Sequence, residues 1–381
     1  MGSAIQILWG WPGSHARYGT KNRISSRRRL AGLGRGYSWP HLSTGQALLN
    51  SLHKLQWPSR RIAFGLLLGF LVLLALALLG DLRQVSERVW TFRWSLYPLV
   101  ILLSLTNYIL RFVKWHFYVQ RVGVDDFPLS LSARLFFSSF PLSITPGKIG
   151  EVLKGIWLNQ LNGMPVGRGI SVVMAERISD GLAVMMLAII GVVAYPRYWP
   201  AFAALLALLL LVVLITQVRP LGTAILRVVR RLPIIRRFAH LLDEFYEGSY
   251  LLFRPSTTLI ATSLGILSWV WEGVGFYLIL IGLGISPGWQ VLSIAIFVLA
   301  FSTIVGAVST LPAGLGVAEV SIAGMLILLL GLKTDIAATA TLLIRFATLW
   351  FSVGLGLVVW FFSRHLLGIE QILQPHDDHI D

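Results

Sequence analysis

The sequence contains no cysteine and few charged residues. Asp, Glu, Lys and Arg make up 13% of its 381 residues, whereas 56% are hydrophobic. Soluble domains carry about twice that charged share, roughly a quarter of their residues. The absence of cysteine excludes disulfides, thiolate metal ligands and cysteine nucleophiles. The scarcity of charge excludes an ordinary water-soluble globular protein, because too little polar surface is available. We therefore predict an integral membrane protein.

Acidic residues are missing from the start of the chain. Residues 1–61 contain ten Lys and Arg, and the first acidic residue is Asp81. Beside an apolar span, this basic segment predicts a cytoplasmic, disordered leader (1–60) attracted to anionic headgroups, and no binding to nucleic acid. An organellar transit peptide or an over-extended reading frame would also explain it. We expect a transmembrane domain at 61–364 and a short acidic tail at 365–381.

Long apolar stretches of about 20 residues predict spanning helices. Two further apolar regions, Leu131–Leu158 and Val291–Leu330, are interrupted by proline and glycine, so each is expected to form two half-helices around a break. The predicted fold class is an all-α polytopic membrane protein, with about six full transmembrane helices plus two broken or re-entrant hairpins. The six expected spans are Ile62–Gly80, Leu96–Val119, Val172–Tyr195, Ala201–Val218, Thr258–Leu283 and Ala337–Phe362.

The distribution of Lys and Arg predicts the orientation. Residues 219–254 carry seven Arg against three acids, so this segment should be cytoplasmic, either as an amphipathic interfacial helix pair or as a solvated basic loop. With a cytoplasmic leader, residues 81–93 become external and the two broken hairpins enter from opposite sides. We expect a multi-pass protein of the plasma membrane with both termini in the cytoplasm.

The two broken regions resemble each other. Pro146 is followed four residues later by Gly150 and then by Glu151, while Pro312 is followed by Gly316 and then by Glu319. An arginine lies 26 residues after each glutamate, at positions 177 and 345. Matching spacing with opposite topology predicts an inverted repeat, an organisation common in transporters.

Ionisable residues within apolar spans are the candidate functional residues. Each costs about 2.5–3.5 kcal/mol at the bilayer centre, so their retention indicates either a structural ion-pair network or a binding site. Arg111, Lys148 and Arg177, with free backbone N–H groups near Gly150, are predicted to form a pocket for a phosphate. The full set of predicted substrate-binding residues is Arg111, Lys148, Glu151, Lys154, Glu176, Arg177, Asp180, Glu319 and Arg345.

The leading functional interpretation is a transporter that moves a phospholipid or other polar lipid between leaflets. A membrane-embedded lipid-modifying transferase is an alternative, because Glu176 and Asp180 could hold a metal; a small-ion or solute transporter is another. The sequence lacks P-loop, H-E-x-x-H and Gly-x-Ser-x-Gly motifs. We expect no enzymatic activity, catalytic residues, metal or cofactor. The expected partners are membrane lipids with anionic headgroups; a homo-oligomer or a partner lipid-modifying enzyme remains open.

At these residues the sequence resembles the transmembrane region of lysylphosphatidylglycerol synthases, the flippase-like domain family of bacteria and archaea. The resemblance extends from about residue 60 to residue 362 and implies re-entrant helices that move a polar lipid between leaflets. Full-length synthases add a soluble aminoacyl-transfer module, whereas only 17 residues follow Arg364 here; we therefore expect no aminoacyl transfer. The matching pieces are Arg111 with Trp115, Pro146–Glu151 with Lys154, Glu176–Asp180, Pro312–Glu319 and Arg345.

Overall fold

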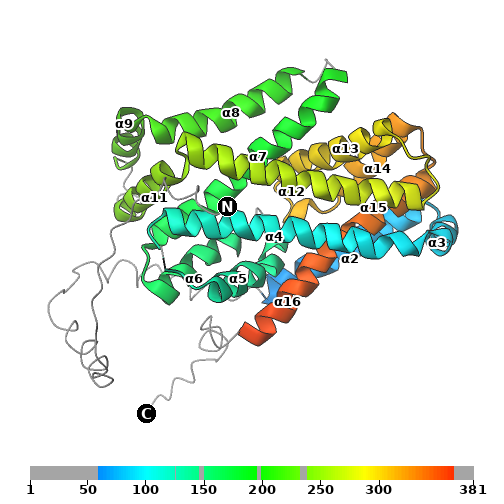
Figure 1. Cartoon of the computed structure of the whole chain (residues 1–381), viewed down its shortest axis with the longest axis horizontal. Helices are drawn as coiled ribbons and strands as arrows, with labels where there is room; N and C mark the ends of the chain where they lie inside the picture. The colour runs from blue at the N-terminus through cyan, green and yellow to red at the C-terminus, as the bar shows by residue number, and fades with distance from the viewer. Residues whose placement is uncertain (1–58, 125, 146–149, 195–198, 232–237, 364–381) are drawn as a thin grey trace, which may run out of the picture. The chain divides into compact units, whose positions relative to one another are not determined.

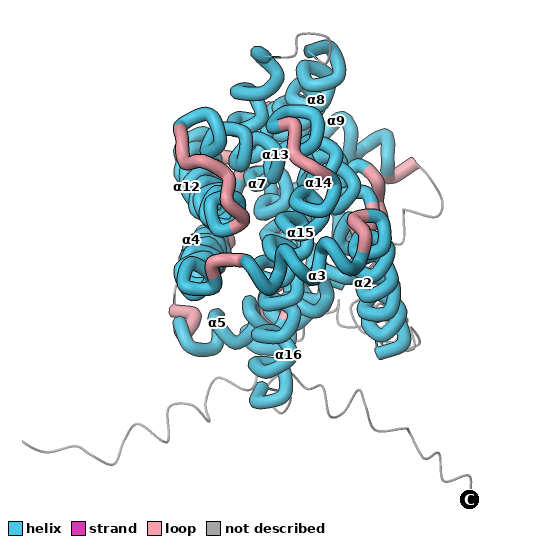
Figure 2. The backbone as a smooth tube through the Cα atoms, turned by 90° about the vertical axis from the view of Figure 1, so that its right-hand side faces the viewer, coloured by secondary structure: helices cyan, strands magenta, loops and turns pink. Residues whose placement is uncertain are grey.

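The computed structural model describes residues 59–124, 126–145, 150–194, 199–231 and 238–363. Within these ranges the chain forms helices and short loops and contains no strand (Figure 2). The predicted all-helical class is therefore confirmed. Only the last two residues of the predicted leader (1–60) are described, and the predicted acidic tail (365–381) lies outside the described residues.

Each of the six predicted spans coincides with a helix. The boundaries are shifted by a few residues from the prediction, most of all in α7, which starts six residues before the expected Val172. The last span starts at Thr334, and in it α15, a π-helical turn η6 and α16 follow one another. The corresponding helices are α2 (Ser59–Leu79), α4 (Tyr97–Arg121), α7 (Val166–Ala194), α8 (Trp199–Gln217), α12 (Pro255–Gly282), α15 (Thr334–Arg345), η6 (Phe346–Trp350) and α16 (Phe351–Ser363).

Length and composition identify five helices of the described chain that could cross a membrane, or up to seven if two bent helix pairs each count as one span. Helix α7 is not among the five, because charged residues interrupt its apolar sequence. Its 29 residues nevertheless give a length of about 43 Å at 1.5 Å per residue, enough to span. The bent pairs join α2 to α3 (Leu82–Thr91) and α8 to α9 (Arg219–Val229).

Helix α12 lies alongside α4 over most of its length and also packs against α7 (Figure 1). Two large apolar clusters fill the bundle. One joins the middle of α7 to α12, α13 (Trp289–Val308), α14 (Val317–Leu330) and α15. The other joins α4, α5 (Leu129–Ser138) and α6 (Leu153–Asn162) to the first half of α7. Helix α7 therefore takes part in both halves of the core.

Contacts among the described residues join helices at two opposite ends of the bundle. At one end, Arg88 of α3 pairs with Asp335 of α15 at 2.7 Å, and the Arg93 N–H donates to the carbonyl of Gly282. At the other end, the Gly167 N–H at the start of α7 donates to Glu244 of α11 (Ala239–Leu252) at 3.1 Å. Figure 1 shows α3 and α11 at these opposite ends. Which end faces the cytoplasm stays a prediction.

The two helix breaks meet inside the bundle. The first includes the 3-10 turn η2 (Phe140–Ile144) and the second the turn η5 (Pro312–Gly314), and these turns contact each other. A small apolar cluster of Ile144, Leu315 and Val353 seals the contact. Because the breaks belong to hairpins that enter from opposite ends, their contact fits the predicted hairpin orientation. An internal repeat of the fold stays a prediction.

The hairpins differ in one respect from the prediction. In the first, α5 and α6 are half-helices of 10 residues each, as expected. In the second, α13 has 20 residues and the stretch Pro312–Leu330, formed by η5 and α14, has 19, and both are long enough to span. The reason is that Val291–Leu330 contains no proline or charge before Pro312, so nothing interrupts the first helix.

Candidate functional site

Three charged residues, Glu176, Arg177 and Asp180, lie close together in the middle of helix α7. Glu176 and Asp180 are four residues apart and share a helix face, while Arg177 lies beside them, three residues before Asp180. The exposed fractions of Glu176 and Asp180 are 1% and 6%. Their charges therefore require partners on neighbouring helices.

Asp180 receives three cations. Lys114, itself 1% exposed, forms a short ion pair with Asp180 Oδ1, and Arg111 from the same helix lies 3.3 Å from Asp180 Oδ2. Arg177 Nη2 lies 3.6 Å from the same Oδ2. Lys114 is buried, but the arginine side chains are 22% and 24% exposed. Both arginine side chains are thus partly accessible, although the Nε of Arg177 is buried.

Glu176 pairs with Lys154 from α6 at 2.6 Å, and both side chains are buried. The Lys154 ammonium also lies over the Trp115 ring, 4.7 Å from its centroid, a favourable cation–π geometry. A close glycine contact makes this approach of α6 to α7 feasible. A Cβ on Gly155 would lie 2.7 Å from the carbonyl carbon of Gly169, so neither position accepts a side chain without separating the helices.

Glu151 precedes α6 in a 3-10 turn, and its Oε2 lies 3.3 Å from Arg177 Nε. Glu151 and Lys154 do not lie together on one regular helix: α6 starts only at Leu153, and the two residues bind different partners. The expected free N–H of Gly150 is also not free, since it donates to Thr145 Oγ1 at 2.9 Å.

A second cluster lies at the other break. Arg345 Nε contacts Glu319 Oε1 at 2.5 Å, and the Glu319 side chain is 1% exposed. The other carboxylate oxygen accepts the N–H of Gly316 at 2.6 Å, which caps the start of α14. Gly316 has φ +86, a conformation that favours glycine. The π-helical turn η6 directly follows Arg345, and such turns are frequent at functional sites.

The structure also brings Glu272 of α12 near both clusters. Its Oε2 accepts a hydrogen bond of 2.6 Å from Asn107 Nδ2, and Arg111 and Arg345 are both close enough for their charges to act on it. Asn107 was not predicted as a site residue, nor was Glu272, although both lie in apolar spans. The signal was the spacing of Asn107, Arg111 and Lys114, which places three polar residues on one face of α4.

The predicted site residues thus divide between the two clusters. One cluster contains the predicted residues of α4, α6 and α7, and Lys114 joins it. The other contains only Glu319 and Arg345. Lys148 lies outside the described residues. In the described chain no three His, Asp or Glu side chains are grouped to hold a metal; Glu176 and Asp180, considered as a metal pair, each bind a lysine instead.

Comparison with known proteins identifies a family. The profile of the family described as the lysylphosphatidylglycerol synthase TM region matches residues 62–356. The chain belongs to this family. The match includes both ion-pair clusters and both helix breaks. A family match of this kind shows a multi-pass membrane protein.

One curated relative is also similar. It is a UPF0104 membrane protein of Methanothermobacter thermautotrophicus, 26% identical over 314 residues, which cover 76% of this chain and 90% of the relative. No solved structure matches the chain.

Proposed function

We propose that this protein translocates a phospholipid or another polar lipid with an anionic headgroup between the leaflets of the plasma membrane. The proposal assigns no chemical change to the lipid. Both termini face the cytoplasm in this proposal, as the Lys and Arg distribution predicts.

The convergence of Arg111 and Arg177 on one carboxylate carries the proposal. Their guanidinium groups lie 3.3 and 3.6 Å from the same oxygen of Asp180 and are both partly exposed. Arginine binds phosphate through two parallel N–H donors, so a lipid phosphate can replace Asp180 as the acceptor without leaving either cation unpaired. A site that only held the bundle together would gain more from fully buried, fixed pairs.

The contact between the two helix breaks supports transport. Irregular backbone at membrane depth is tolerated where it is buried in protein or lines a wet cavity, and transporters place substrate sites at such breaks near the midplane. Here Glu151 and Glu319 each follow a break and each bind an arginine. We infer that rearrangement of these pairs accompanies passage of the headgroup.

A reconstitution assay tests the proposal. The protein is incorporated in liposomes that contain a headgroup-labelled phosphatidylglycerol, and a membrane-impermeant quencher reports how fast label from the inner leaflet becomes accessible. Wild type is compared with Arg177→Gln and Arg111→Gln. The control is Arg83→Gln, an exposed residue whose side chain is 88% accessible. We expect the wild type and the control to accelerate exchange and both site variants to lose at least tenfold of the rate, since a charge-assisted hydrogen bond contributes about 1.5–3 kcal/mol.

Two outcomes would contradict the proposal. If folded wild-type protein accelerates no labelled lipid, anionic or neutral, the transferase and small-solute alternatives become the better interpretations. If the two site variants exchange lipid as fast as the wild type, the arginines are structural and the substrate path lies elsewhere. Size-exclusion chromatography of each variant separates loss of folding from loss of transport.

A further inference from the structure

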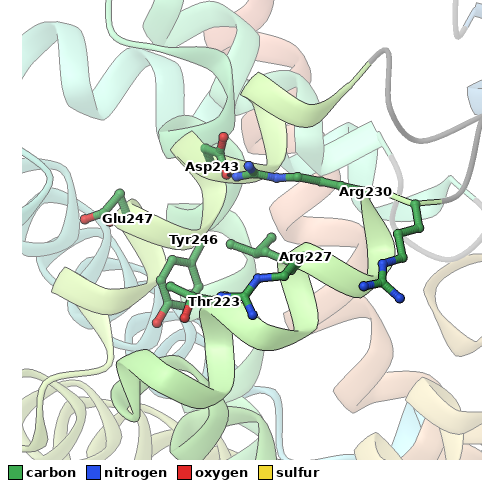
Figure 3. Close-up of a pocket in the computed structure, with 8 residues that line it drawn as sticks. Thr223, Arg227, Arg230, Asp243, Tyr246 and Glu247 are labelled. Atoms are coloured by element: carbon green, nitrogen blue, oxygen red, sulfur yellow. Dashed lines mark hydrogen bonds and ion pairs between the residues drawn. The ribbon is translucent and has the colours of Figure 1, made fainter.

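A cleft of about 530 Å³ opens between α9 and α11, outside the spanning part of the bundle. Figure 3 shows that the two helices face each other across it and that the Arg230 side chain reaches over to Asp243. The cleft combines three arginines, two carboxylates and a tyrosine. These residues are Arg227, Arg230, Arg231, Asp243, Tyr246 and Glu247.

Arg227 and Arg231 have guanidinium N–H donors without an acceptor among the described residues. Arg230 forms an ion pair with Asp243, and Glu247 lies 3.9 Å from Arg219, so both carboxylates are neutralised by neighbouring cations. In contrast, the side chains of Arg227 and Arg231 make no ion pair or hydrogen bond with any described residue. The cleft therefore presents two free guanidinium groups.

The orientation of α9 places the cleft at a membrane surface. Helix α9 bends by 95° from α8, so if α8 crosses the bilayer, α9 lies along it. Leu221, Ile225 and Val228 are spaced to share one helix face, and all three are exposed. By helix periodicity Arg227 lies on another face of α9, and Arg231 lies in the turn that follows the helix. Such a helix places its apolar face in the headgroup–acyl boundary and its arginines among the headgroups.

We propose that the α9–α11 cleft binds the phosphate of an anionic phospholipid in the adjacent leaflet, with Arg227 and Arg231 as charged donors. The exposed apolar face favours a lipid over a free phosphate, because acyl chains would cover Leu221, Ile225 and Val228. This site shares no residue with the Arg111–Arg177 cluster and does not depend on the proposed transport.

Native mass spectrometry of the full-length protein in detergent tests the site. Dioleoyl phosphatidylglycerol is titrated, with dioleoyl phosphatidylcholine and inorganic phosphate as separate arms. The variant R227Q/R231Q is compared with wild type and with R121Q/R254Q, which removes the same charge from two other arginines at the same end of the bundle.

We expect phosphatidylglycerol to bind wild type and R121Q/R254Q equally, and R227Q/R231Q at least tenfold more weakly, because two charge-assisted hydrogen bonds are lost. The single variants R227Q and R231Q should each weaken binding several-fold. They also test the site if R227Q/R231Q fails to fold, as judged by size-exclusion chromatography.

Three results would overturn the proposal. Equal phosphatidylglycerol affinity in wild type and R227Q/R231Q would remove the arginines from the site. Equal binding of phosphatidylcholine would show that charge is not recognised. Competition by inorganic phosphate at the same concentration as the lipid would identify a site for a soluble anion. Each result is independent of whether the protein moves lipid between leaflets.

Discussion

The Glu319–Arg345 pair allows a quantitative test of how much one buried ion pair stabilises the bundle. Glu319→Ala leaves the Arg345 guanidinium, whose side chain is 14% exposed, without its carboxylate at 2.5 Å. An uncompensated buried charge costs about 3–5 kcal/mol. The same change removes the acceptor for the Gly316 N–H, which adds about 1 kcal/mol or more. At about 2–4 °C per kcal/mol, the melting temperature in detergent should fall on the order of 10 °C.

Two further variants separate the contributions. Glu319→Gln keeps an oxygen for the Gly316 N–H, so its melting temperature should lie between those of the alanine variant and the wild type. Glu319→Ala combined with Arg345→Leu removes both charges, and it should recover most of the loss, because replacing a buried pair by apolar side chains is often neutral. The control is Glu87→Ala, whose pair with Arg83 is exposed and contributes at most about 1 kcal/mol. A melting temperature of Glu319→Ala within 2 °C of the wild type, or a double variant no more stable than the single one, would refute this reasoning.

Three other outcomes are expected. Gly155→Val should destabilise the protein by several kcal/mol, because its Cβ would meet the α7 backbone at 2.7 Å. Gly354→Ala should be neutral, since its Cβ would meet nothing within 4 Å. Thermal melting checks both variants. Trp115→Leu removes the ring under Lys154 and should lower the free energy of unfolding by about 1–2 kcal/mol beyond the change in packing. The same substitution in a Lys154→Met background measures the packing contribution alone. Asp180→Asn should lower the melting temperature more than any single neutralised arginine, because it leaves buried Lys114 unpaired.

The spans and breaks could be predicted from the sequence because each rests on local chemistry. Apolar runs of spanning length have no alternative to helices in lipid, and each predicted span contains one. Pro312 and Gly316 marked the second break, where Ala313 and Gly314 also adopt positive φ. The length of α13 was not predicted, because the pattern identified the break without showing that the helix before it was complete.

The ion-pair partners could not be predicted, because they depend on how helices pack. Glu151 and Lys154 have the spacing of an intrahelical pair. In the packed bundle, however, Lys154 forms an ion pair with Glu176, and Glu151 forms one with Arg177. The role of Lys114 was also missed. Helix spacing placed it beside Arg111, but only the approach of α7 brings Asp180 between them.

The two glutamate–arginine pairs have the same spacing in sequence but different surroundings, and this difference separates their roles. Glu319 caps its own helix and holds Arg345 at 2.5 Å in a nearly closed setting. Arg177 is instead shared between Glu151 at 3.3 Å and Asp180 at 3.6 Å and is more exposed. A cation shared between two carboxylates can exchange one for an incoming anion at lower cost than a cation fixed by one short pair. The cluster around Arg177 is therefore the better candidate for headgroup binding, and the Arg345 cluster for holding the second break in place.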